Sequence, residues 1–179
     1  RMNNITEFTF ETTYNQKAMT TMACALRKTV RKKHSRKSHI LGWIVTILAL
    51  FLVLPIGGRE IAFNFKTIIT WAAILLIVAA LIWEDQLNGY FARKRMLPGT
   101  TYAVCIFEED GYISEVQAGK TEWKYENIEV IAETKEYFVF VFGKNHAQVY
   151  DKKGLKGGST EEFRTFIAEK TGKEVWQIK

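Results

Sequence analysis

The sequence predicts an α+β membrane protein in which a two-helix transmembrane hairpin is joined to a cytoplasmic antiparallel β module closed by a C-terminal helix. Two observations support this fold class. Two long apolar segments occupy residues 40–83, and from residue 100 onward short runs of β-forming residues alternate with turn residues.

The apolar segments have the length that a bilayer requires. Residues 40–58 (ILGWIVTILALFLVLPIGG) contain no charge, and a helix of this length extends about 28 Å at the usual rise of about 1.5 Å per residue. Residues 63–83 contain only Lys66, whose long side chain can reach the interface. Trp43 and Trp83 are expected at the membrane interface. The alternative, a buried hairpin inside a soluble bundle, would normally show a polar stripe, and neither segment has one.

Basic residues flank both segments on the same side and so predict the orientation. They are Arg27, Lys28, Arg31, Lys32, Lys33, Arg36 and Lys37 before the first span, and Arg93, Lys94 and Arg95 after the second. We therefore expect both termini in the cytoplasm of a bacterial cell and a short loop outside. These residues could serve only as the topology signal, or they could also attract anionic lipid headgroups. The simpler topology role is favoured.

The charge distribution argues against nucleic-acid binding. Residues 1–39 carry nine Lys and Arg against two Glu, whereas residues 97–179 carry eleven basic against fourteen acidic residues. A nucleic-acid-binding domain would place a basic face on the folded part of the chain. The expected partners are the lipid bilayer and an unidentified protein, for which a toxin is one candidate; a homo-oligomer is left open.

Three regions follow from these patterns. Residues 2–14 contain a predicted strand that could join the cytoplasmic sheet. Residues 15–96 form the helical hairpin, beginning with Asn15 as an N-cap and an apolar stripe that includes Ala18, Met22 and Leu26. Residues 97–179 form the cytoplasmic domain.

Six strands are predicted in residues 97–179: 101–107, 112–117, 120–125, 127–134, 137–143 and 146–151. Asp110-Gly111 is a hairpin turn signal. Residues 137–142 (YFVFVF) are apolar on both faces, which predicts a strand covered on both sides. The glycines at 154, 157 and 158 mark a loop, and residues 173–179 could add a short strand.

The last predicted element is a helix that starts with a Ser159/Glu162 capping box and ends near Gly172. With the N-terminal strand, the six strands and this helix would make a small seven-stranded antiparallel barrel or sandwich. That is the architecture of a pleckstrin-homology-like (PH-like) module.

The segment from Phe107 through STEEFRTFI resembles the YcxB-like C-terminal domain of bacterial two-pass membrane proteins. The residues that match are Phe107, Asp110, Gly111, Trp123, Ile128, Glu133, Phe138 and Phe163. FTFETTY before the basic helix is also similar to the opening of those proteins. The resemblance implies a relation to bacterial PH-like domains and brings no settled activity with it.

No catalytic or metal-binding constellation is recognisable, so we expect a protein that is not an enzyme and needs no cofactor or metal. Cys105 lies among apolar neighbours and Cys24 on the helix stripe, as expected of packed thiols. The metalloprotease, nucleotide-binding and serine-hydrolase motifs are missing. The favoured function is a membrane-anchored interaction module; the alternative is an immunity protein that protects the membrane against a bacterial toxin.

Overall fold

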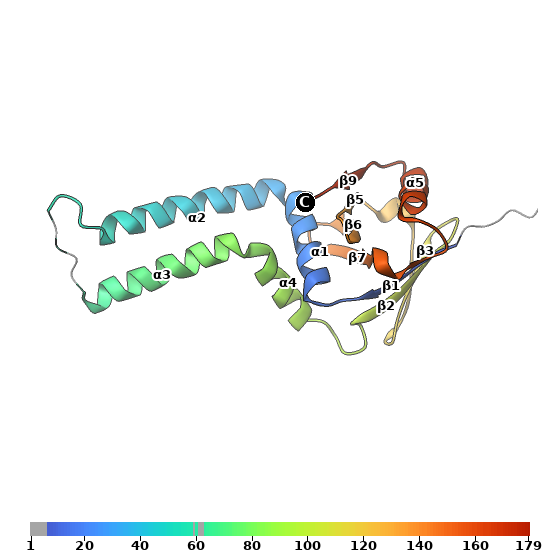
Figure 1. The fold of residues 1–179 in the computed structure, drawn as a ribbon, viewed down its shortest axis with the longest axis horizontal. Helices are drawn as coiled ribbons and strands as arrows, with labels where there is room; N and C mark the ends of the chain where they lie inside the picture. Colours follow the sequence, from blue (N-terminus) through green and yellow to red (C-terminus); the bar gives the residue numbers. More distant parts are fainter. Residues whose placement is uncertain (1–6, 59, 61–62) are drawn as a thin grey trace, which may run out of the picture.

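The computed structural model describes residues 7–58, 60 and 63–179. A long two-helix arm projects from a folded β module (Figure 1). The arm, here called the apolar hairpin, consists of α2 (Lys32–Val53) and α3 (Phe65–Ile82). The β module comprises all the strands together with α5 (Thr160–Thr171). Residues 2–6 of the predicted N-terminal region and Arg59 of the linker lie outside the described residues.

The β module is built from two sheets. The first has the order β4-β3-β2-β1-β8 and the second the order β7-β6-β5-β9. The strands of the first sheet are β1 (Phe8–Thr13), β2 (Tyr102–Phe107), β3 (Tyr112–Val116), β4 (Gly119–Trp123) and β8 (Leu155–Lys156). Those of the second are β5 (Val130–Glu133), β6 (Tyr137–Gly143), β7 (His146–Asp151) and β9 (Val175–Gln177).

The N-terminal strand β1 pairs antiparallel with β2 over its whole length, from Phe8 opposite Phe107 to Thr13 opposite Tyr102. These paired segments are separated in sequence by the entire hairpin. The two strands that enter and leave the helical region are therefore hydrogen-bonded to each other, so both ends of the hairpin arise from one sheet.

An aromatic core lies between the two sheets and α5. The ring of Phe163 on α5 is 4.6 Å from that of Phe10, 5.0 Å from that of Phe107 and 5.1 Å from that of Phe138, measured between centroids. All four side chains are fully buried. Ser159 and Glu162 form the predicted capping box, and Gly172 ends the helix in the left-handed conformation at φ 65°.

Strand β6 is covered on both faces, as its sequence predicts. Phe138 and Phe140 belong to the aromatic core, whereas Val139 and Val141 pack with Ala18 of helix α1 (Gln16–Lys28) on the opposite face. The period-two alternation of a strand thus sorts the large rings toward α5 and the smaller side chains toward α1.

Several predicted strand boundaries were wrong. The predicted strand 120–125 ends at Trp123, and residues 125–127 form a 3-10 turn before β5. The loop expected from its glycines contains the two-residue strand β8, which pairs with β1. Strand β9 pairs parallel with β5, so the second sheet is not purely antiparallel. A second 3-10 turn spans Lys152–Gly154.

The helical segment that begins at Asn15 is divided before the first apolar helix. Asn15 is the N-cap, accepting a hydrogen bond from the Ala18 amide, but α1 ends at Lys28. At Thr29 the backbone leaves the helical region (φ −107°, ψ −99°), and its hydroxyl donates to the Ala25 carbonyl at 2.6 Å. The break lets α1 lie on the β module while α2 leaves it (Figure 1).

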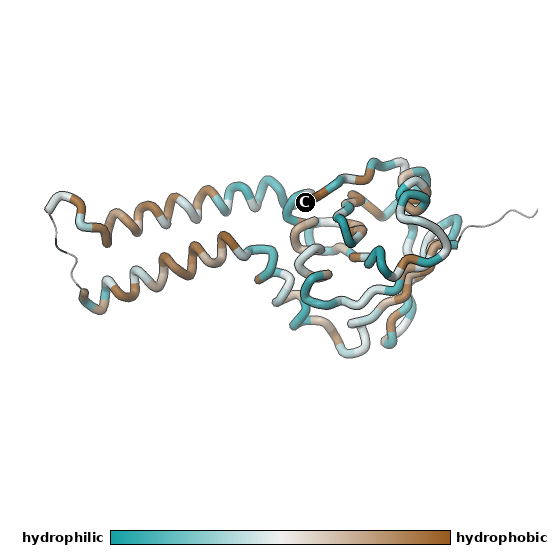
Figure 2. Tube along the Cα trace, viewed as in Figure 1, coloured by the Kyte–Doolittle hydropathy of each residue, from teal (hydrophilic) through white to brown (hydrophobic). Residues whose placement is uncertain are grey.

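The hairpin helices are apolar around most of their surface. In the apolar window of each helix only 6% of the residues are buried. Figure 2 shows hydrophobic residues along both arms and hydrophilic residues where the arms meet the β module. The described part of the chain thus contains two helices that are long and apolar enough to cross a membrane.

Candidate functional site

The apolar hairpin is joined to the β module by close packing of α1 against α4 (Glu84–Lys94). Gly89 is buried at this contact, and a Cβ atom added there would lie 2.7 Å from the Thr20 backbone nitrogen. The backbones of α1 and α4 therefore lie closer together here than a side chain at residue 89 would permit. Tyr90 and Phe91, which could have filled this contact, are instead half exposed.

A charged cluster reinforces the same junction. The Arg27 guanidinium donates two hydrogen bonds of 2.7 Å to the Asp85 carboxylate, and this bidentate bonding raises the pKa of Arg27. On the neighbouring residue, the Glu84 carboxylate lies 2.5 Å from His39 Nε2 and accepts from the Ser35 hydroxyl at 3.3 Å. Together these contacts connect α1 and α2 to the start of α4.

The predicted basic residues divide into two groups. Arg27, Lys28 and Arg31 are engaged within the protein: Lys28 donates to the Lys179 carbonyl, and Arg31 bonds the turn between β6 and β7. The remaining seven are exposed and form no ion pair among the described residues. They are Lys32, Lys33, Arg36, Lys37, Arg93, Lys94 and Arg95.

The two predicted interface tryptophans are both exposed, Trp43 by 44% and Trp83 by 53%. Trp43 lies near the middle of α2, six residues after Lys37 and three after Ile40, the first residue of the predicted span. Trp83 lies at the junction of α3 and α4, at the end of α3 next to the β module.

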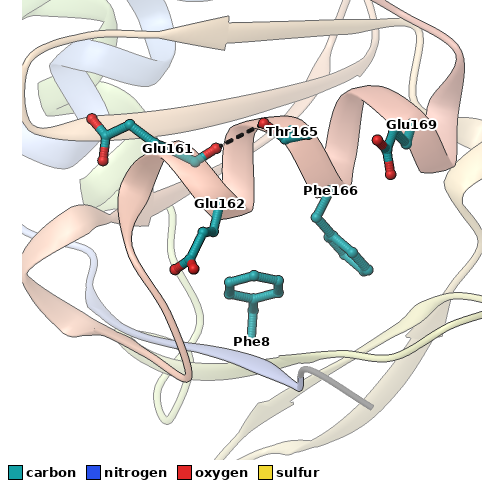
Figure 3. A pocket seen from close by; sticks show the side chains of 6 residues that line it. All are labelled: Phe8, Glu161, Glu162, Thr165, Phe166 and Glu169. Atoms are coloured by element: carbon teal, nitrogen blue, oxygen red, sulfur yellow. Dashed lines mark hydrogen bonds between the residues drawn. The ribbon is translucent and has the colours of Figure 1, made fainter. Parts of the chain in front are cut away.

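A second candidate surface lies on α5, at the end of the β module away from the hairpin (Figure 1). It is a shallow groove of about 410 Å³ in which Glu162 and Phe166 point from α5 toward Phe8 of β1 (Figure 3). Glu161 and Glu169 also line it, so its rim is acidic and its floor aromatic. The Glu162 carboxylate accepts a 2.6 Å hydrogen bond from the Ser159 amide, which lowers its pKa. No sequence pattern indicated this groove, because Phe8 and α5 are far apart in the chain.

The thiols show no sign of activation. Burial raises the pKa of Cys105 to about 11. A weak contact of its thiol with the Ser114 hydroxyl at 3.5 Å partly opposes this increase. Burial also raises the pKa of Cys24. Both therefore stay protonated near neutral pH, unlike nucleophilic cysteines. Among the described residues no group of three or more His, Cys, Asp or Glu is arranged to hold a metal ion.

The most strongly bonded carboxylate is Glu133, 1% exposed on β5. It accepts hydrogen bonds from Arg164 at 2.7 Å, from Lys152 at 2.5 Å and from Gln177 at 2.5 Å. Burial alone would raise its pKa, but these hydrogen bonds outweigh burial and lower the pKa to about 2. Its partners come from three other elements, so the cluster joins α5 and β9 to the sheet and is structural.

The structure is thus an α+β protein with two apolar helices and two largely antiparallel sheets. Residues 107–167, from the end of β2 into α5, match the family model described as YcxB-like protein. The match confirms the resemblance noted in the sequence, and all eight of the residues that suggested it lie within the matched segment. No curated protein and no solved structure matches the chain.

Proposed function

We propose that this chain is a non-enzymatic two-pass membrane protein that presents a PH-like interaction module at the inner face of the bacterial cytoplasmic membrane. The observation that carries the proposal is the uncovered hairpin. Leu52 of α2 is 79% exposed and Leu76 of α3 is 72% exposed, and nothing in the described chain covers either face. In water such a surface would favour aggregation, whereas a bilayer supplies the apolar solvent that it requires.

The proposed orientation follows from where the exposed cations lie. All seven flank the ends of the hairpin next to the β module, whereas the sequence at the distal end offers only Arg59 and Lys66, offset in part by Glu60. Basic residues are retained on the cytoplasmic side of a membrane. The β module and both termini would then be cytoplasmic.

The junction between hairpin and module supports a presenting role. A flexible tether would leave the module free to rotate, but here Gly89 packs on the backbone of α1 and Arg27 is bound by Asp85. The module would consequently hold one orientation, with the α5 groove facing away from the bilayer. Two sheets closed by a C-terminal helix support the PH-like assignment.

The partner that fits the α5 groove is a basic protein segment with an apolar side chain. Phe166 and Phe8 offer an apolar floor, and Glu161 and Glu169 form no ion pair among the described residues. One cation lies nearby: Lys170 sits 5.8 Å from the Phe166 ring centroid, and its ammonium is 3.7 Å from Glu109. The groove itself is lined by no basic residue, so charge complementarity favours a basic ligand.

Site-specific photo-crosslinking in living cells tests the proposal. A crosslinking amino acid in place of Thr165, in the groove, is expected to give a discrete adduct with one protein. The same amino acid in place of Lys120, exposed on β4, should not give that adduct. The double variant Glu161→Gln/Glu169→Gln should weaken it, because it removes charge without changing shape. Absence of an adduct from residue 165, or equal adducts from both positions, would contradict the proposal.

The same experiment separates the immunity alternative. An immunity protein that packs against membrane helices of a toxin would use the hairpin surface, where Phe51 is 57% exposed. A crosslinker at residue 51 should then capture the toxin while residue 165 captures nothing. Capture of a second copy of this chain at residue 51 would instead indicate a homo-oligomer.

A further inference from the structure

A basic groove lies where the hairpin meets the β module, between the start of α2 and the turn that connects β6 to β7. Its volume is about 750 Å³. The charged and polar residues that line it are Thr29, Arg31, Lys32, Lys33, His34, Lys144 and Asn145. No carboxylate lines it. Lys144 is more than a hundred residues from Lys32 and Lys33 in the chain, so only the fold brings these cations together.

One wall of the groove is held in place by Arg31. Its Nε donates to the Lys144 carbonyl at 2.5 Å, and its Nη2 donates to the Asn145 side-chain oxygen at 2.9 Å. These bonds tie the start of α2 to the β6–β7 turn. The side chains of Lys32, Lys33 and Lys144 are exposed and form no ion pair among the described residues, so their charges remain available.

The groove lies at the outer surface of the headgroup layer. Lys33 and Lys32 precede Ile40, where the apolar surface of α2 begins, by seven and eight residues, so their backbones lie about 10–12 Å from the hydrocarbon edge. The headgroup layer on each side of a bilayer is about 5–8 Å thick, and a long lysine side chain can extend toward it. Lys144 lies on the β module, so a headgroup at this depth would meet cations from both parts of the molecule.

We propose that this groove binds the phosphate-bearing headgroup of an anionic phospholipid. Lys32 and Lys33 approach from the hairpin and Lys144 from the module. The proposal rests on the membrane insertion proposed above and adds a specific lipid site to it. A simple topology signal needs only basic residues near the ends of the spans. It does not need Lys144, or an arginine that ties the two elements together.

Lipid retention by the purified full-length chain tests this site. The protein would be reconstituted in nanodiscs of equal phosphatidylglycerol and phosphatidylcholine, released, and examined by native mass spectrometry for the lipids that stay bound. We expect phosphatidylglycerol to be retained at least tenfold over phosphatidylcholine, since one basic group near a membrane contributes about fivefold in binding. No preference for phosphatidylglycerol would overturn the proposal.

Two triple variants remove the same charge from different places. Lys32→Gln/Lys33→Gln/Lys144→Gln empties the groove of its free cations and should abolish the preference. Arg93→Gln/Lys94→Gln/Arg95→Gln removes the same charge from the α4 flank outside the groove and should lower the preference much less than the groove variant does. Equal loss in both variants, or loss in neither, would contradict a specific site. All six residues are exposed, and near-ultraviolet circular dichroism would confirm that both variants are folded.

Inorganic phosphate distinguishes the two sources of the ligand. Millimolar phosphate should leave the retained lipid in place; displacement of the lipid would assign the groove to a soluble phosphate and overturn the lipid assignment. Alkaline extraction of cell membranes separates this result from the proposed function. A chain that stays in the membrane but shows no lipid preference would refute only the headgroup site, whereas a chain that is extracted would refute the anchoring as well.

Discussion

The apolar hairpin and the β module use similar side chains in opposite ways. Phe140 in the module is fully buried, whereas Phe51 in the hairpin is 57% exposed. In the module, aromatic rings from both sheets and α5 meet one another; in the hairpin, leucine, isoleucine and phenylalanine point outward around both helices. Because apolar side chains are stable where water is excluded, this contrast supports the proposal that the hairpin lies in lipid while the module folds in water.

The largest expected effect comes from removing the ring that joins the two sheets. Phe163→Ala should lower the free energy of unfolding of the β module by about 3–5 kcal/mol, since it leaves a cavity among the surrounding rings. The matched variant Phe51→Ala, in the hairpin, should leave the module's unfolding unchanged. Thermal unfolding of the full-length protein in detergent, followed by near-ultraviolet circular dichroism, measures both. Equal destabilisation by the two variants would contradict the claim that Phe163 packs in the core of the module while Phe51 does not contribute to its stability.

The next effect concerns the charged cluster of Glu133. Glu133→Gln leaves Arg164 and Lys152 without their counter-charge, which should cost about 3 kcal/mol at pH 7. Because the folded-state pKa is lowered to about 2, the contribution is complete above the unfolded pKa and is lost as the pH falls toward 2.

Urea titrations at a series of pH values isolate the contribution of the ionised Glu133 carboxylate to the free energy of unfolding. The stability difference between wild type and Glu133→Gln should be constant above about pH 5 and shrink steadily below it. A difference that persists at pH 2 would show that the carboxylate's charge is not what stabilises the cluster.

A smaller effect is expected at the junction of the two regions. Gly89→Ala places a Cβ atom 2.7 Å from the Thr20 backbone nitrogen, so α1 and α4 must move apart at a cost of about 1–3 kcal/mol. Asn88→Ala, at an exposed position one residue away, should be neutral or slightly stabilising. Hydrogen exchange of α1 and α4 amides would report the loss of packing directly. Unchanged exchange in Gly89→Ala would show that this contact does not hold the helices.

The smallest effect belongs to the Arg27–Asp85 pair. Asp85→Asn weakens two charge-assisted hydrogen bonds between partly exposed groups and should cost about 1 kcal/mol. Lys120→Gln removes the partner of Glu115 in a pair whose side chains are 65% and 44% exposed, and should cost less than about 0.5 kcal/mol. Similar small losses in both variants would mean that the junction pair is no stronger than an ordinary surface pair.

Local sequence patterns predicted the structural features that depend only on residues close together in the chain. The Asn15 cap and the Ser159/Glu162 capping box follow from short-range rules and are confirmed. The two-sided burial predicted for residues 137–142 is confirmed for 137–141, whereas Phe142 is only partly buried. The break at Thr29 was missed because the basic run continues across it with good helix formers. What breaks the helix is tertiary packing, since α1 lies on the β module.

The candidate surfaces depend on long-range contacts that no local pattern reveals. No sequence pattern predicts that Lys144 lies near Lys32. None predicts that Phe8 lies beside Phe166. Strand β8 is too short to show a period and was missed; it pairs with the edge of β1. Strand β9 lies within residues 173–179, which were expected to add a short strand, but its parallel pairing with β5 was not predicted. Seven of the ten predicted basic residues are exposed beside the hairpin, and their role as a topology signal stays a prediction. That Arg27 and Arg31 instead bind within the protein required the fold.

The accessibility of two engineered cysteines to a membrane-impermeant maleimide tests the proposed topology most directly. Ile56→Cys lies in the short linker between the hairpin helices, and Glu174→Cys is exposed on the β module. In intact cells we predict that only the Ile56→Cys variant is labelled above the wild-type background, and that Glu174→Cys is labelled after lysis. Labelling of Glu174→Cys in intact cells, or recovery of the unlabelled protein in the aqueous fraction without detergent, would contradict a hairpin that crosses the membrane with the module inside.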